Sequence, residues 1–234
     1  MATILDNKQV TALVTGANRG LGKRFATDLV ARGAKVYAAA RRPDSVTIPG
    51  VIPVALDITD AESVRRAAEI ASDVNVVVNN AGVSTQSNLL SGGMDDIRLE
   101  METHYFGTLQ VTRDFAPVIE RNGGGAILNV LSVLSWAHAP QFGAYAAAKA
   151  AGWAMTDALR EELAPRGIHV AALHVGFMDT DMAEFVPADQ KLDPAVVASQ
   201  ALDGLFAGEP EILGDALTRT VRAQLSQAPR VATL

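Results

Sequence analysis

The chain has 234 residues, of which 49% are hydrophobic and 20% are charged, and it contains no cysteine. Its length suits one domain, or at most two small ones, with a sizeable core. The lack of cysteine excludes disulfides, thiolate metal sites and a cysteine nucleophile. The formal net charge of −6 argues against nucleic-acid binding. No apolar run reaches the roughly 18 residues of a membrane span. The first residues, 1–6, resemble no signal peptide, so we expect a cytoplasmic protein without membrane association.

Short apolar segments alternate with helical patterns along the first half of the chain. Between residues 20 and 31, the apolar side chains of Leu21, Phe25 and Leu29 recur at helical spacing, and Gly33 follows as a stop signal. Runs of apolar residues without alternation are typical of buried parallel strands. This half therefore predicts strands at 10–15, 35–40, 51–56 and 74–79, and helices at 20–31 and 61–71.

The second half repeats the alternation with longer helices. It predicts helices at 95–121 and 142–164, strands at 126–131 and 168–174, and an apolar segment at 211–215 before a helix that ends near Ser226. The whole chain, 1–234, is thus predicted to form a single doubly wound α/β domain of the Rossmann type, with a mostly parallel sheet of six to seven strands and helices on both faces. The irregular segment 180–194 is expected to form a short lid over the ligand crevice.

The segment 15–22 reads TGANRGLG and lies directly between the first strand and the first helix. Glycines at this junction permit a tight turn and let backbone N–H groups approach a pyrophosphate at the helix N-terminus. The pattern predicts a dinucleotide site. We expect its contacts from this turn to come from Gly16, Asn18, Arg19, Gly20, Leu21 and Gly22.

The end of the second strand indicates which dinucleotide is bound. An NAD site usually has an acidic residue here, whereas this chain has Arg41 and Arg42, with no acid before Asp44. Guanidinium groups suit the 2′-phosphate of NADP, and Arg19 adds a third. The alternative is that these arginines are ordinary solvated surface charges. The missing acid favours NADP(H) as the cofactor.

Three residues of the second half have the chemistry of a carbonyl-reducing site. Tyr145 and Lys149 are four residues apart, and therefore lie on one face of the predicted helix, while Ser132 follows a strand. A lysine cation favours the phenolate and is expected to lower the pKa of the tyrosine from its ordinary value near ~10. Ser132 would hold the substrate oxygen, and Tyr145 would exchange the proton while the nicotinamide carries the hydride.

These motifs, in this order, resemble those of the short-chain dehydrogenase/reductase family. The matching pieces are TGANRGLG at 15–22, Asp57-Ile58, NNAG at 79–82, Ser132, and Tyr145 with Lys149. The resemblance implies that Asp57 and Ile58 flank the adenine and that Asn79, Ala81 and Gly82 shape the cofactor groove. It further implies that Tyr145 and Lys149 also contact the cofactor, Lys149 through the nicotinamide ribose, and that Gly176, Phe177, Met178 and Thr180 lie beside the nicotinamide.

The chain departs from the family pattern at two positions. His104 stands where relatives carry an asparagine that holds a proton-relaying water, and Val175 precedes Gly176 where relatives carry proline. His104 has two interpretations: it relays protons through a ring nitrogen, or it bonds to the backbone and merely holds the helix. The backbone turn at Val175 and Gly176 is expected to form as in relatives with proline, but to be somewhat less rigid.

Apolar residues near Ser132 suggest the substrate class. Trp136 and His138, in the loop after Ser132, are predicted to line the pocket with Phe142 and Phe185, although each phenylalanine also fits an ordinary core position. A hydrophobic or aromatic ketone, aldehyde or alcohol is the expected small-molecule substrate. The four histidines lack metal-ligand spacing, so no metal site is expected.

The leading functional hypothesis is an NADPH-dependent carbonyl reductase, reversible as a secondary alcohol dehydrogenase. The alternatives are a non-catalytic NADP(H)-binding redox sensor and a ketoreductase dedicated to a polyketide or lipid intermediate. Family members usually assemble through the two long helices, here 95–121 and 142–164. A homodimer or homotetramer is therefore expected.

Overall fold

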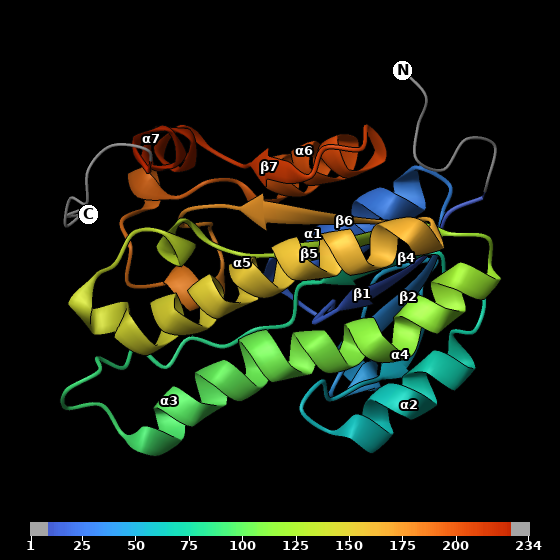
Figure 1. The fold of residues 1–234 in the computed structure, drawn as a ribbon, viewed down its shortest axis with the longest axis horizontal. Coiled ribbons are helices and arrows are strands. Elements are labelled where there is room, and N and C mark those ends of the chain that lie inside the picture. Colours follow the sequence, from blue (N-terminus) through green and yellow to red (C-terminus); the bar gives the residue numbers. More distant parts are fainter. Residues whose placement is uncertain (1–8, 226–234) are drawn as a thin grey trace.

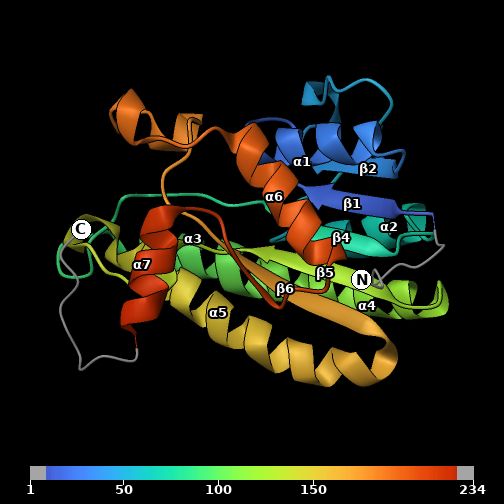
Figure 2. The ribbon, with the colours of Figure 1, turned by 90° about the horizontal axis from the view of Figure 1, so that it is seen from above.

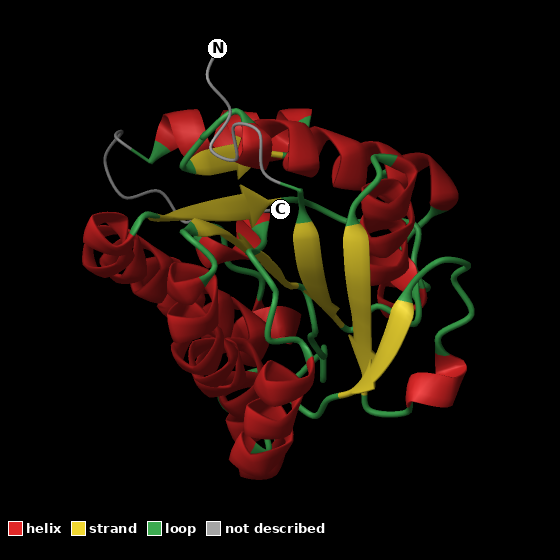
Figure 3. Cartoon of the chain, turned by 90° about the vertical axis from the view of Figure 1, so that its right-hand side faces the viewer, coloured by secondary structure: helices red, strands yellow, loops and turns green. Residues whose placement is uncertain are grey.

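The computed structural model describes residues 9–225, and its centre is one seven-stranded sheet in which every pairing is parallel (Figures 1 and 3). The strand order is β3-β2-β1-β4-β5-β6-β7. The strands are β1 (Thr11–Thr15), β2 (Lys35–Ala40), β3 (Ile52–Ala55), β4 (Val76–Asn79), β5 (Gly125–Val130), β6 (Ile168–His174) and β7 (Glu211–Leu213). The predicted doubly wound parallel sheet is confirmed.

Helices cover both faces of the sheet, as Figure 3 shows. Successive strand residues point to opposite faces, so Val14 packs toward α1 (Gly20–Ala31) and α6 (Pro194–Phe206), while Leu13 packs toward the other helical layer. That second layer consists of α2 (Ala61–Ile70), α4 (Thr108–Arg121) and α5 (Gly143–Leu163). Two shorter helices, α3 (Met94–Met101) and α7 (Ala216–Gln224), lie near the ends of the sheet (Figures 1 and 2).

The structure differs from the sequence prediction within the helix expected at 95–121. Here α3 and α4 are separated by a π-helical turn, Glu102–Gly107, which contains the buried His104. Single π turns inside helices occur often at functional sites because they re-aim side chains. The turn thus places His104 differently from a residue of a regular α-helix.

The irregular segment 180–194 contains two single turns of 3₁₀ helix and ends at α6, which the sequence interpretation did not include. Asp193 caps α6 by accepting a hydrogen bond from the backbone N–H of Ala195 at 2.8 Å, and Pro194 is its first residue. At the other end of the chain, α7 ends at Gln224, and Ser226 lies outside the described residues. Within residues 9–225, no helix is long and apolar enough to cross a membrane.

Candidate active site

The predicted site residues gather at the carboxyl ends of the central strands. The glycine turn follows β1, segment 80–82 follows β4, Ser132 follows β5 and Gly176 follows β6. These strands lie side by side in the sheet (Figure 2). In doubly wound sheets, ligands bind where the strand order reverses, which here is the boundary between β1 and β4.

The turn after β1 brings three glycines into close backbone contact. Gly16 and Gly20 have φ values of +66° and +53°, a left-handed conformation that favours glycine. A Cβ on Gly22 would lie 2.3 Å from the carbonyl oxygen of Gly16 and 2.4 Å from Nδ2 of Asn80. The glycines therefore permit a tight turn that packs closely against the segment after β4. This geometry fits the pyrophosphate of a dinucleotide.

The segment after β4 supports the glycine turn through a residue that sequence reasoning missed. Asn80 donates from Nδ2 to the carbonyl oxygen of Thr15 at 2.9 Å, and the backbone N–H groups of Asn80 and Ala81 both donate to Oγ1 of Thr15 at 3.0 Å. The side chain of Asn79, by contrast, points into the sheet and donates to Oδ1 of Asn129 at 2.8 Å. Asn79 therefore contributes to buried packing, while Asn80 joins β4 to the turn. Two adjacent asparagines gave no sequence signal of which one faces the turn.

The three arginines predicted to meet a phosphate differ in their surroundings. Arg41 and Arg42 are exposed at the end of β2, and neither guanidinium has a hydrogen-bond or ion-pair partner among residues 9–225. Arg19 forms an ion pair with Asp181 at 3.0 Å, although both side chains remain largely exposed. The guanidinium groups of Arg41 and Arg42 are thus free to bind an anion, whereas that of Arg19 forms an ion pair with a residue of the segment 180–194.

Asp57 and Ile58, which follow β3, differ in burial. Asp57 accepts hydrogen bonds at Oδ1 from the backbone and hydroxyl of Thr59, at 3.0 and 2.7 Å. Ile58 is buried, and a Cβ on Gly107 would lie 3.0 Å from it. The Asp57 carboxylate thus stabilises the turn after β3.

The segment after β6 is held from two directions. The backbone N–H of Gly176 donates to Oδ2 of Asp215 at 2.7 Å, and the carbonyl oxygen of Phe177 accepts from Leu192 at 2.9 Å. A Cβ on Gly20 would lie 3.3 Å from Thr180. The segment that includes Met178 and Thr180 therefore reaches the glycine turn.

Ser132, Tyr145 and Lys149 come together between β5 and α5. Ser132 and Lys149 are buried, and the Ser132 side chain hydrogen-bonds Tyr145. The Lys149 ammonium donates to the carbonyl oxygen of Val130 at 2.8 Å and lies 5.5 Å from the centre of the Tyr145 ring. A hydroxyl, a phenol and an ammonium are thus adjacent, as the sequence predicts.

The electrostatics of Tyr145 differ from the sequence prediction. Burial, and next the negative charge of Glu100, raise the pKa of Tyr145 well above its ordinary value, while the hydrogen bond from Ser132 opposes them. The predicted lowering of this pKa by Lys149 is therefore wrong for the protein without a ligand, because burial dominates. Burial also lowers the pKa of Lys149 to about 8. Tyr145 remains a neutral phenol and can donate a proton.

His104 lies against this group and is almost fully buried. Its Nε2 is 2.8 Å from the carbonyl oxygen of Val83 and 3.2 Å from Oε2 of Glu100. Its ring meets the Tyr145 ring edge to face, with centroids 5.1 Å apart. Glu100 was not singled out from the sequence, although its spacing of four residues from His104 places the two on one helical face.

A cavity of about 760 Å³ opens beside the start of α5, two residues from Tyr145. His138 lines this cavity, whereas Trp136 does not. Trp136 is 8% exposed and stacks on His174 with centroids 3.8 Å apart, so the prediction that it lines the pocket is not supported by its position. The cavity is lined by Asn88, Leu89, Leu90, Ser91, His138, Ala139, Pro140, Gln141 and Gly143.

The phenylalanines form a separate cluster. Phe142 is buried and contacts Phe177 and Phe185, with ring centroids 6.3 and 5.7 Å apart. Phe185 is 51% exposed and is therefore no core residue. Tyr145 packs against the buried cluster that includes Phe142, so these rings adjoin the phenol.

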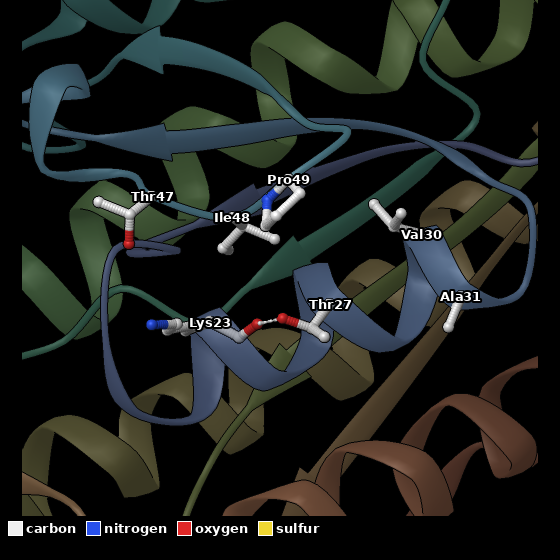
Figure 4. A pocket seen from close by; sticks show the side chains of 7 residues that line it. All are labelled: Lys23, Thr27, Val30, Ala31, Thr47, Ile48 and Pro49. Atoms are coloured by element: carbon white, nitrogen blue, oxygen red, sulfur yellow. Dashed lines mark hydrogen bonds between the residues drawn. The ribbon is translucent and has the colours of Figure 1, made fainter.

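A second cavity of about 390 Å³ lies between α1 and the segment that follows β2 (Figure 4). None of the predicted cofactor or catalytic residues lines it. Within residues 9–225, no group of three His, Asp or Glu side chains is placed to hold a metal ion. The residues predicted to be catalytic therefore lie around Tyr145, outside this second cavity. The second cavity is lined by Lys23, Thr27, Val30, Ala31, Thr47, Ile48 and Pro49.

Comparisons with known proteins agree with this fold. The sequence model of the short chain dehydrogenase family matches residues 10–191. The chain is 32% identical over 231 residues to the uncharacterized oxidoreductase YbbO of Escherichia coli (strain K12), over 95% of this chain and 84% of that protein. It is 33% identical over 190 residues to a dehydrogenase/reductase SDR family protein 7-like of Anopheles gambiae. That match includes 73% of this chain and 60% of the length of the relative.

Among solved structures, a short chain dehydrogenase from Burkholderia cenocepacia J2315 in complex with NADP is similar, with a TM-score of 0.90 and 38% identity. The match covers 94% of each chain. The fold and these matches define an oxidoreductase. The chain belongs to the short-chain dehydrogenase/reductase family.

Proposed function

We propose that this protein is an NADPH-dependent carbonyl reductase, reversible as a secondary alcohol dehydrogenase, that acts on a hydrophobic or aromatic substrate. The observation that carries the proposal is the group formed by buried Ser132 and Lys149 with half-buried Tyr145, between β5 and α5. A redox sensor without catalysis needs no such group. The raised pKa of Tyr145 favours the proton-donating form, which the reduction of a carbonyl requires.

The residues divide the reaction between them. Ser132 donates a hydrogen bond to the substrate oxygen and orients it toward Tyr145. As negative charge develops on that oxygen, Tyr145 donates its phenolic proton, and the Lys149 ammonium stabilises the phenolate that remains. Hydride transfer is the chemistry that a nicotinamide supplies when the cofactor is bound.

NADP(H) is the proposed cofactor. Its support is the tight glycine turn between β1 and α1, the two guanidinium groups of Arg41 and Arg42 without partners among residues 9–225, and the NADP carried by the similar Burkholderia cenocepacia protein. The glycine turn would hold the pyrophosphate, and the arginines would hold the 2′-phosphate.

The proposed hydrophobic substrate rests on the surroundings of Tyr145. The cavity beside α5 carries Leu89 and Leu90, which are 58% and 102% exposed, and the phenylalanine cluster adjoins the phenol. Such apolar surface favours uncharged ketones and aldehydes over phosphorylated sugars. Segment 180–194, joined to Arg19 through Asp181, is proposed as a lid over this site.

A homodimer or homotetramer is proposed through α5. The outer face of this helix presents a row of exposed or half-exposed alanines, which permits close contact with a second copy. These residues are Ala147, Ala151, Ala154 and Ala158.

Tyr145→Phe tests the function directly. It removes the proton donor and keeps the ring, so we expect the rate of NADPH oxidation with aryl and aliphatic ketones to fall by about 100-fold or more. NADPH binding, followed by its fluorescence, should be retained. Tyr105→Phe, on the neighbouring π turn, is the matched control and should leave the rate unchanged. Binding of NADPH by the unsubstituted protein without turnover of any carbonyl compound would favour a sensor instead.

A further inference from the structure

Glu100 is a fully buried carboxylate that the proposed reaction does not use. Its Oε1 accepts hydrogen bonds from the backbone N–H and the hydroxyl of Thr85, at 2.6 and 2.9 Å. Its Oε2 lies 3.2 Å from Nε2 of His104 and has no other polar partner among residues 9–225. A buried charge is costly unless it is paired, so the position of this carboxylate against His104, whose ring meets Tyr145, calls for a role.

The two neighbours of His104 Nε2 assign the tautomer of its ring. The Val83 carbonyl and the Glu100 carboxylate are both acceptors, so Nε2 carries the hydrogen and Nδ1 holds the lone pair of the neutral ring. The ring cannot shift easily. Tyr145 meets it edge to face on one side, and a Cβ on Gly82 would lie 2.7 Å from its Cε1 on another.

Burial and mutual contacts decide the protonation states of Glu100, His104 and Lys149. Burial opposes ionisation of Glu100, but hydrogen bonds from His104 and Thr85 hold its pKa below the ordinary value, so it is a carboxylate. Burial, and next the Lys149 cation, lower the pKa of His104, so its ring is neutral. The pKa of Lys149 falls to about 8 by burial, which the Glu100 charge opposes.

The titratable neighbours of the pair are few. From α5 they are Tyr145 and Lys149, and the loop 83–87 contributes only backbone and hydroxyl groups. On α3, Asp96 faces Ser87, whose hydroxyl donates to it at 3.2 Å. Among these groups, Glu100 is the carboxylate that contacts His104, and its charge opposes the lowering of the Lys149 pKa by burial.

We propose that Glu100 is a positioning residue of the reaction: it contacts Nε2 of His104, holds that ring against Tyr145 with the hydrogen on Nε2, and adds a negative charge to the buried region of Tyr145 and Lys149. The proposal rests on the proposed carbonyl reduction. It adds to Ser132, Tyr145 and Lys149 a fourth group that acts through its neighbours. The spacing of four residues across the start of the π turn is what brings the carboxylate to the ring.

Glu100→Gln tests the charge while it preserves the shape of the side chain. Loss of the negative charge should lower the pKa of both Tyr145 and Lys149, so the basic limb of kcat/KM for ketone reduction should move to lower pH by about one unit. The control is Glu102→Gln, which removes an exposed carboxylate two residues away. Its pH profile should overlay that of the unsubstituted protein. An unshifted limb in Glu100→Gln, with only a uniformly lower kcat, would overturn the proposal.

A second measurement needs neither a variant nor turnover. In ¹⁵N NMR of the histidine-labelled protein without ligand, His104 should show the Nε2–H tautomer and remain neutral well below its ordinary pKa. The signal is assigned by its loss in His104→Asn. A Nδ1–H tautomer, or ordinary titration of His104, would overturn the proposal even if Glu100→Gln failed to fold. If no carbonyl compound is turned over, the proposed function fails, while this spectrum still decides the Glu100–His104 pairing.

Discussion

Arg41 and Arg42 directly follow β2, and their adjacent guanidinium groups have no partners in residues 9–225, so both side chains are free to meet a phosphate. The double variant Arg41→Ala, Arg42→Ala should weaken NADPH binding by about tenfold or more, because a hydrogen bond to a charged group contributes roughly 1.5–3 kcal/mol. NADH binding should change much less, since it lacks the 2′-phosphate. Fluorescence titration with each cofactor measures the two dissociation constants, and their ratio reports the preference for NADPH.

A matched control is Arg113→Ala, which removes an exposed guanidinium from α4. It should leave both affinities unchanged. An equal loss of NADPH and NADH binding in the double variant would mean that the two arginines act on a shared part of the cofactor, or on the fold, and that they do not read the 2′-phosphate.

At the scale of single residues, the sequence predicts best where spacing and chemistry coincide. Tyr145 and Lys149 share a helical face, so their proximity follows from local pattern alone, whereas Ser132 reaches them through the packing of β5 against α5. The roles of Asn79 and Asn80 depend on which of two neighbours faces the turn, which the strand register decides. The rise of the Tyr145 pKa depends on burial, which no local pattern reports.

Asp215 joins the start of helix α7 to the segment that follows β6. Asp215 caps this helix by accepting from the backbone of Thr218 at 2.8 Å and from its hydroxyl at 2.7 Å, and it also accepts from the backbone of Gly176 at 2.7 Å. Asp215→Ala should therefore lower the free energy of unfolding by about 1–3 kcal/mol. Because it also frees the segment that follows β6, it should raise KM for the cofactor. Urea unfolding and steady-state kinetics measure the two effects.

Asp193→Ala separates these effects, because Asp193 caps α6 through Ala195 and is exposed. This variant should lose about 1 kcal/mol of unfolding free energy with an unchanged KM. If both variants left KM unchanged, the Asp215 bond to Gly176 would be merely structural.

At the scale of elements, the strands are the most predictable part of the chain. Their apolar runs need little context, because a parallel sheet buries both faces. Helix α6 was missed even though Asp193 and Pro194 form a recognisable start, because apolar Val196 also lies on its exposed face and weakens the periodic signal. The π turn at 102–107 was not predicted, since it depends on how α3 and α4 pack around His104.

At the scale of the whole molecule, buried neutral histidines make the free energy of unfolding depend on pH. His174 ends β6, is fully buried and lies with Nδ1 3.1 Å from the carbonyl oxygen of Ser132. Burial lowers its pKa to about 3, from an ordinary value of 6.5. Its stabilising contribution is complete above the ordinary value. It declines as pH falls toward about 3, because the unfolded chain binds a proton that the folded chain does not.

His174→Phe should reduce the acid sensitivity of the fold. Between about pH 6 and pH 4, each such histidine adds up to about 1.4 kcal/mol per pH unit to the slope of unfolding free energy, and the variant lacks one of them. Urea unfolding followed by circular dichroism across this range measures the slope. His138→Phe replaces an exposed histidine and should retain the slope of the unsubstituted protein. Parallel curves for His174→Phe and the unsubstituted protein would show that His174 already takes up its proton in the folded state. The bond to the Ser132 carbonyl would then hold a charged ring beneath Ser132, the proposed partner of the substrate oxygen.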